Sequence, residues 1–117
     1  VTEDQLAVTV GSGSLRVCAT PMLAALMEKT ACAAVAEFLE DGETTVGTAL
    51  DLAHTAATPE GMTVTATAEI TAVSGREITF AITASDEVGE VGHCTHKRFL
   101  VKSESFMKKA AAKKESL

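Results

Sequence analysis

TPMLAALMEKTACAAVAEFL, residues 20–39, is the stretch that decides the fold. Thr20 is a favoured N-cap residue, and Pro21 suits the first helical position. Strong helix formers follow as far as Gly42, and glycine is the usual residue just beyond a helix end. At about 100° per residue, one arc of this helix carries the charged side chains of Lys29, Glu37 and Glu40. The stretch therefore predicts a helix that is mostly buried, with one narrow solvent-facing stripe.

Beyond Gly42 the hydrophobic period changes to that of a strand. From Met62 to Ala72, for example, apolar residues alternate with threonine and glutamate. Patterns of this kind predict strands at Leu6–Val10, Val46–His54, Met62–Ala72, Ile78–Ala84 and Glu90–Val101. A sheet must bury one face, and the chain supplies only one long helix to cover it. We therefore expect an α+β fold in which an antiparallel sheet wraps around one long central helix.

Length and composition narrow the class of protein. The 117 residues suit one domain, 1–117, in which residues 102–117 form a flexible or helical basic tail. The net charge of -6 and the absence of Trp and Tyr argue against nucleic acid as a partner. No apolar run approaches the roughly 20 residues that span a bilayer, so we expect no membrane partner. Three widely spaced cysteines and the lack of a signal-peptide pattern favour a reducing, cytoplasmic location.

Glu28 is the first candidate for chemistry. It lies roughly 130° around the helix from the charged stripe, on the face rich in Ala, Leu and Met. A carboxylate removed from water often serves as a general base or nucleophile. Alternatively, this face meets solvent or a subunit boundary, and Glu28 only pairs with a cation.

Three further residues are candidates, each with a simpler structural explanation. Every second residue from Val46 to His54 lies on one face of the strand, and this face is apolar at Val46, Leu50 and Leu52 and polar at Thr48. His54 ends this face, so it could be a hydrogen-bonded core residue. Thr20 could be only an N-cap, or its hydroxyl could lie where the helix dipole favours negative charge. Gly47 inside a strand indicates a bulge or a closely approaching ligand.

The remaining His and Cys residues do not predict a metal site. On a strand, His93 faces away from Cys94 and His96, and no carboxylates complete a ligand set. Cys32, one turn after Glu28, is expected to be a small buried filler.

Three stretches, ATPMLAALMEKTACAAV, TTVGTALDLAHTAATPEGMTVTATAEITAVSGREITF and DEVGEVGHCTHKRFLV, together resemble the hot-dog-fold thioesterases related to fluoroacetyl-CoA thioesterase. The similarity covers roughly residues 11–101. It implies a hot-dog fold and catalytic roles for Thr20, Glu28 and His54, with the Gly47 N–H helping to hold the thioester carbonyl. It also implies a homodimer or higher homo-oligomer, with acyl-CoA bound at or near a subunit boundary and no cofactor beyond the CoA of the substrate.

Two departures from the family pattern stand out. Residues 11–17, GSGSLRV, are short and carry no aromatic residue where the fluoroacetyl-specific relatives have a Phe- and Pro-containing lid. This argues against fluoroacetyl specificity. Cys94 stands where relatives usually have glycine.

The resulting hypothesis is hydrolysis of a small acyl-CoA thioester. Gly47 would stabilise the oxyanion, Glu28 would attack the carbonyl or activate water, and His54 would move protons. The CoA phosphates would need cations, for which Arg98, Lys97 and the C-terminal lysines are candidates. A non-catalytic acyl-CoA or small-ligand binding module and an acyl-thioester hydratase or dehydratase are the alternatives.

Overall fold

The computed structural model describes residues 1–117. Its main helix is α2 (Thr20–Val35), which continues into a 3₁₀ turn at Ala36–Phe38. The strands are β1 (Glu43–His54), β2 (Thr65–Ser74), β3 (Glu77–Ser85) and β4 (Glu90–Lys102). The smaller helices are α1 (Ala7–Val10) and α3 (Ser103–Ala112), with further 3₁₀ turns at Glu3–Gln5 and Lys113–Ser116. No helix is long and apolar enough to cross a membrane.

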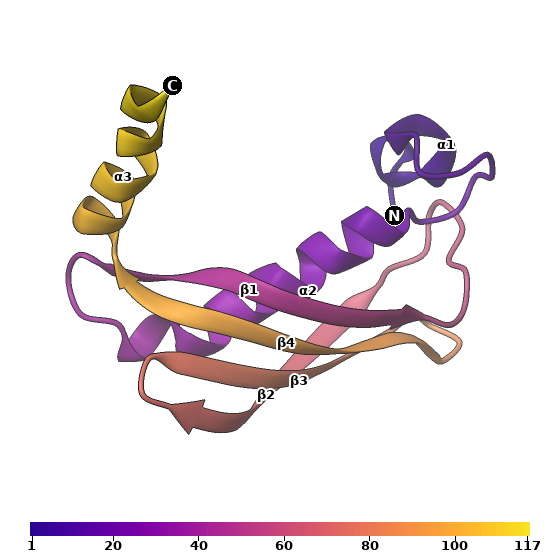
Figure 1. The fold of residues 1–117 in the computed structure, drawn as a ribbon. Coiled ribbons are helices and arrows are strands. Elements are labelled where there is room, and N and C mark those ends of the chain that lie inside the picture. Colours follow the sequence, from indigo (N-terminus) through magenta and orange to yellow (C-terminus); the bar gives the residue numbers. More distant parts are fainter.

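The four strands form one antiparallel sheet in the order β1-β4-β3-β2, and α2 lies across one face of it (Figure 1). The predicted α+β architecture with one long helix against an antiparallel sheet is confirmed. Strands β1 and β2 are the two edges, and neither has a partner strand on its outer side.

The core lies between α2 and the sheet. Four α2 side chains spaced four residues apart are buried: Leu23, Met27, Ala31 and Val35. They pack against the inward side chains of β3 and β4, with Phe80, Ile82, Ala84, Val91 and Cys94 buried in the same cluster. The prediction that α2 is mostly buried is wrong, because a single sheet covers only one side of the helix. Its other side exposes a stripe of residues, here called the α2 stripe, made of Pro21, Ala25, Glu28 and Cys32.

The N-terminal segment is not the predicted strand at Leu6–Val10. It folds into a 3₁₀ turn and α1, because the N–H groups of Thr9 and Val10 both bond the Leu6 carbonyl. Leu6 itself is fully buried and makes one isolated β-bridge to Cys18. This segment forms a small lobe beside the start of α2 (Figure 1).

A bulge in β1 decides which of its residues face α2. The pairing of β1 with β4 shifts between Gly47 and Ala49. Before the bulge, the odd-numbered Thr45 and Gly47 face the buried side chain of Arg98. After it, the even-numbered Leu50 and Leu52 pack against the core. The predicted unbroken alternation through Val46, Thr48 and Leu50 is therefore wrong, since an inserted residue reverses the strand faces.

Candidate functional site

Glu28 and Gly47 meet on the helix-facing side of the sheet. The Glu28 Oε2 atom lies 3.8 Å from Nη1 of Arg98, whose side chain is 7% exposed against 47% for Glu28. A Cβ added at Gly47 would lie 3.3 Å from Arg98 Nη1 and 3.6 Å from Glu28 Oε2. A side chain at position 47 would therefore crowd this cluster, which explains the glycine. Glu28 is not buried in the apolar face. Its position fits the alternative expectation, that this face of α2 is open and that Glu28 pairs with a cation.

Arg98 is held in place by a network that sequence reasoning missed. Its Nε donates to Thr45 Oγ1 at 2.8 Å and its Nη2 to the Thr45 carbonyl at 2.9 Å. Its Nη1 donates to Nε2 of His96 at 3.1 Å. Because a guanidinium can only donate, the ring proton of His96 lies on Nδ1, which donates to the Ala49 carbonyl at 2.8 Å. Period-two alternation from Cys94 through His96 to Arg98 is the signal that could have revealed this cluster.

This placement differs from the one expected for Arg98. We expected a cation available to the CoA phosphates, but the guanidinium is buried and directed at Glu28. Lys97 points to the opposite face of β4, where its Nζ lies 3.8 Å from Glu77 Oε1.

Thr20 and His54 form a second group. Thr20 Oγ1 lies 2.8 Å from His54 Nδ1. The structural explanation of Thr20 as an N-cap is wrong, since Ala19 occupies that position and Thr20 is the first helical residue. Its hydroxyl is free to bond the imidazole at the end of β1. The side chains of Thr20 and His54 both line a hollow between the N-terminal lobe and residues 55–57.

The structure does not bring these two groups together within one chain. Thr20 and Glu28 are eight helical residues apart, which separates their Cα atoms by about 12 Å. The side chains cannot span that distance, and no hydrogen bond joins Glu28 to Thr20 or His54. Each chain therefore carries two half-sites, one with Glu28, Gly47 and Arg98 and one with Thr20 and His54.

Buried hydrogen bonds anchor the loop that follows His54. Thr58 is fully buried, its hydroxyl donates to Asp86 Oδ2 at 2.9 Å, and its carbonyl accepts the N–H of Cys18 at 2.8 Å. Asp86 Oδ1 also accepts the N–H groups of Val88 and Gly89 at 2.9 and 3.2 Å. The loop, the β3–β4 turn and the approach to α2 are thus tied together around Thr20 and His54.

Asp86→Asn is expected to lower the free energy of unfolding at neutral pH. The Val88 N–H, followed by the Thr58 hydroxyl, lowers the pKa of Asp86 below its ordinary value of 3.8. Because folding lowers the pKa of Asp86, the ionised carboxylate stabilises the folded protein at pH values above its ordinary pKa. This stabilisation is lost as the pH falls through the pKa of the folded state. Urea unfolding of both proteins at several pH values checks this: the difference should be full at pH 7 and shrink below about pH 4. An Asn variant of equal stability at pH 7 would contradict it.

Other His and Cys residues stand apart from both half-sites. His93 faces outward, with Nδ1 3.5 Å from Glu90 Oε2. Burial raises the pKa of the Cys94 thiol, and the nearby Asp51 raises it further. Cys32 is exposed on the α2 stripe, so its prediction as a buried filler is wrong. No group of three His, Cys, Asp or Glu side chains is arranged to hold a metal ion.

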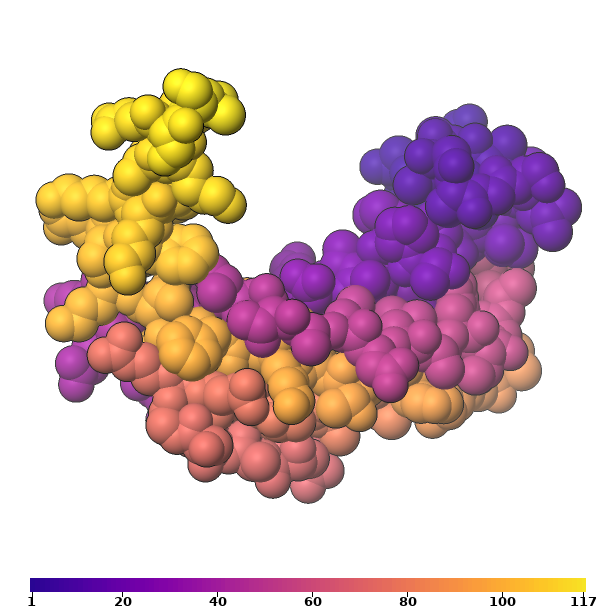
Figure 2. Space-filling model, viewed as in Figure 1, coloured from indigo at the N-terminus to yellow at the C-terminus, as the bar shows by residue number.

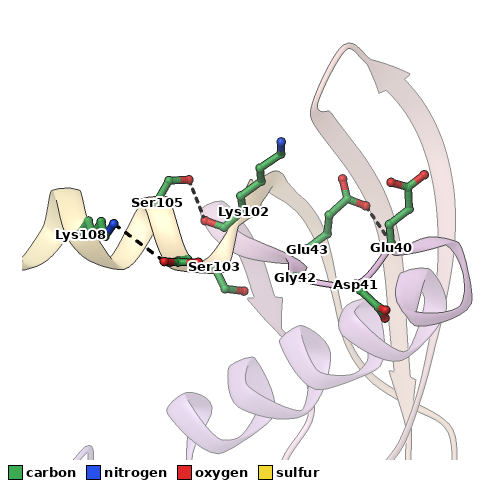
Figure 3. A pocket seen from close by; sticks show the side chains of 9 residues that line it. Glu40, Asp41, Gly42, Glu43, Lys102, Ser103, Ser105 and Lys108 are labelled. Carbon is green, nitrogen blue, oxygen red and sulfur yellow. Dashed lines mark hydrogen bonds and ion pairs between the residues drawn. The ribbon is translucent and has the colours of Figure 1, made fainter.

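A separate hollow at the base of α3 is lined by residues of both charges and by no hydrophobic residue (Figure 3). Its acidic side comes from Glu40, Asp41 and Glu43, and its basic side from Lys102 and Lys108. It contains none of the predicted catalytic residues.

One long helix laid across one face of an antiparallel sheet is the architecture of the hot-dog fold. A hot-dog-like protein from Thermanaerovibrio acidaminovorans shares this fold, with a TM-score of 0.88 at 23% identity over 97% of this chain and 84% of that one. Residues 1–104 match the family of fluoroacetyl-CoA-specific thioesterases, and the chain belongs to this family. The predicted hot-dog fold and family are confirmed.

Two relatives within the family are similar in sequence. The fluoroacetyl-CoA thioesterase of Streptantibioticus cattleyicolor is 44% identical over 95 residues, which are 81% of this chain and 68% of the relative. The crystal structure of a variant of the fluoroacetyl-CoA-specific thioesterase FlK in complex with fluoroacetate and CoA has a TM-score of 0.86 at 38% identity. It covers 91% of this chain and 90% of that one.

Proposed function

We propose that Glu28 and Gly47 of one protomer, with Thr20 and His54 of its partner, form the catalytic centre of this thioesterase. The enzyme hydrolyses a small acyl-CoA thioester. The observation that carries the assignment is the Glu28 carboxylate, which a buried arginine holds beside a glycine with no side chain in the way.

The chemistry follows from these groups. The Gly47 N–H would donate to the carbonyl oxygen as negative charge develops there. Glu28 would either activate a water molecule for attack on the carbonyl or attack it directly and be released by water. In both routes one water molecule is consumed, the carbon–sulfur bond breaks, the acyl group leaves as the free acid, and the CoA sulfur leaves as a thiolate that takes a proton. His54, with Nδ1 bonded to Thr20, would present its other ring nitrogen for that proton transfer.

Free-thiol release from a panel of short acyl-CoA thioesters tests this function. The panel includes acetyl-CoA and fluoroacetyl-CoA. We expect hydrolysis of short acyl groups without a strong preference for the fluorinated one, because residues 11–17 carry no aromatic side chain and residues 11–16 are exposed. Binding of acyl-CoA with no thiol release would instead support a binding module, and formation of a hydrated or dehydrated acyl thioester would support the hydratase alternative.

A dimer formed through the β1 edge would join the half-sites. The edge is twelve residues long and has no partner strand, and such edges pair readily. The α2 stripe beside it exposes mostly small residues around Glu28, which suits packing against another helix. Antiparallel two-fold pairing of β1 sets the Gly47 half of one strand against the His54 half of the other. Each dimer would then hold two complete sites.

The reaction is proposed to need no cofactor and to take place in the cytoplasm. A carboxylate, a guanidinium and backbone N–H groups supply the charges that the reaction requires. Three free thiols suit a reducing compartment. We expect hydrolysis to be unchanged after treatment with EDTA, measured as thiol release before and after removal of the chelator. Loss of activity that added Mg²⁺ or Zn²⁺ restores would contradict this expectation.

A further inference from the structure

We propose that α3 of one protomer lies beside its partner's Thr20 and His54, where its lysines bind the phosphate groups of the CoA part of the substrate. The inference rests on the proposed function and on the two-fold dimer. It assigns a role to the basic C-terminal segment, which the catalytic centre leaves unused.

No other element of the same chain buries a residue of helix α3. It projects from the end of β4, and every one of its residues is exposed, including Phe106 at 40% and Met107 at 60%. Its base is fixed, because the Ser103 N–H bonds the Gly42 carbonyl at 2.9 Å. In addition, Ser105 Oγ bonds the Lys102 carbonyl at 3.3 Å (Figure 3). Figure 2 shows a hollow between this arm and the N-terminal lobe, with β1 along its floor. A second copy paired on β1 would fill that hollow.

Charge is divided sharply along the chain. Residues 102–117 carry five lysines and two glutamates, whereas the rest of this chain of net charge -6 has a net charge of -9. Lys108 pairs with Glu104 at 3.8 Å. The other lysines of this arm, Lys109 of α3 and Lys113 and Lys114 of the 3₁₀ turn that continues it, take part in no ion pair. They are therefore available to an anionic ligand, while the acidic body of the chain favours an arm of opposite charge.

The hollow at Thr20 and His54 lacks the cations that a CoA ligand requires. None of its nine lining residues is a lysine or an arginine. The nearest arginine along the chain, Arg16, is bonded to Glu60 at 3.1 Å. CoA carries a diphosphate and a 3′-phosphate, so its binding calls for positive charge from another element.

Two-fold symmetry brings α3 of one protomer to the hollow at Thr20 and His54 of its partner. The base of α3 lies beside the first residue of β1, because Glu43 pairs with Lys102. His54 is the last residue of the same strand. Antiparallel pairing of two β1 edges exchanges these ends, so α3 of one protomer meets the His54 end of the other. The lysines then belong to the composite site that contains Glu28 of their own chain.

Neutralising the three free lysines tests the role of α3. In the triple variant Lys109→Gln, Lys113→Gln, Lys114→Gln we expect the KM for acyl-CoA and the Kd for CoA to rise about tenfold, with kcat unchanged. Acyl-pantetheine, which has no phosphate, should show no change. The effect should fade at high salt, and the control Lys97→Gln should behave as wild type. An unchanged Kd for CoA would overturn the proposal, and so would an equal loss with acyl-pantetheine.

Mixed dimers identify which chain supplies the lysines. In a dimer of a Glu28→Ala chain with a His54→Ala chain, the intact site takes Glu28 from the His54→Ala chain. The triple lysine change placed on that chain should raise the KM of the recovered activity, and placed on the Glu28→Ala chain it should not. The reverse result would overturn the assignment. Inactivity of the wild-type enzyme on acyl-CoA would instead count against the proposed function. In that case the Kd for CoA, measured by calorimetry for the wild-type protein and the triple variant, still tests the role of the lysines.

Discussion

Glu28→Ala is expected to reduce kcat for acyl-CoA hydrolysis by about 10²- to 10⁴-fold, the usual range for removal of a general base. The fold should persist, because alanine is a better helix former than glutamate and the Glu28 side chain is half exposed. Arg98 keeps its bonds to Thr45 and His96 in the variant. Steady-state thiol release and a thermal unfolding curve measure the two effects.

A matched variant separates the chemistry from the loss of a charge. Glu37→Ala removes a carboxylate just beyond α2 and should leave both the rate and the unfolding midpoint unchanged. Glu28→Gln, which keeps the shape but cannot act as a base, should be as slow as Glu28→Ala. A Glu28→Ala protein that hydrolyses its best substrate at the wild-type rate would show that the catalytic assignment is wrong.

Mixing two inactive variants is expected to restore activity. Glu28→Ala and His54→Ala proteins should each be nearly inactive, and unfolding and refolding them together should recover about a quarter of wild-type activity. Random assembly makes half of the dimers mixed, and each mixed dimer has one intact site of two. Sedimentation would first establish that the chain is a dimer or a multiple of dimers.

Further pairings make the mixing experiment specific. Thr20→Ala should complement Glu28→Ala, because the two residues lie in different half-sites. It should not complement His54→Ala, because Thr20 and His54 belong to the same half-site. No recovery in proven mixed dimers of Glu28→Ala and His54→Ala would place the whole site in one chain, and a fully active monomer would do the same.

Much of this architecture follows from local sequence signals. The helix at residues 20–35 comes from its start residues and from a run of strong helix formers. The four strands come from period-two alternation, which survives because each strand buries one face. Glu28, His54 and Gly47 could be selected before the fold was known, since each is unusual for its local position. Thr20 could be selected because it stands at the helix start, where the dipole favours negative charge.

The roles of those residues depend on contacts that the local pattern does not encode. Thr20 was expected to cap α2, but the end of β1 brings His54 to its hydroxyl. Arg98 was a candidate for binding the CoA phosphates, but it lies on the inward face of β4 and is directed at Glu28. His96 was considered only as a metal ligand, because its partner, the Ala49 carbonyl on a neighbouring strand, is distant in sequence.

The sequence by itself determined the main helix, the four strands and the α+β class, because helix and strand periodicities are local properties of the chain. Only the tertiary structure decided which faces those side chains occupy. One inserted residue in β1 turns Gly47 toward Arg98 and keeps Leu50 and Leu52 in the core. A sheet that covers one side of α2 leaves Glu28 on an open surface. Burial and strand pairing join residues far apart in sequence, so no local pattern could have predicted them.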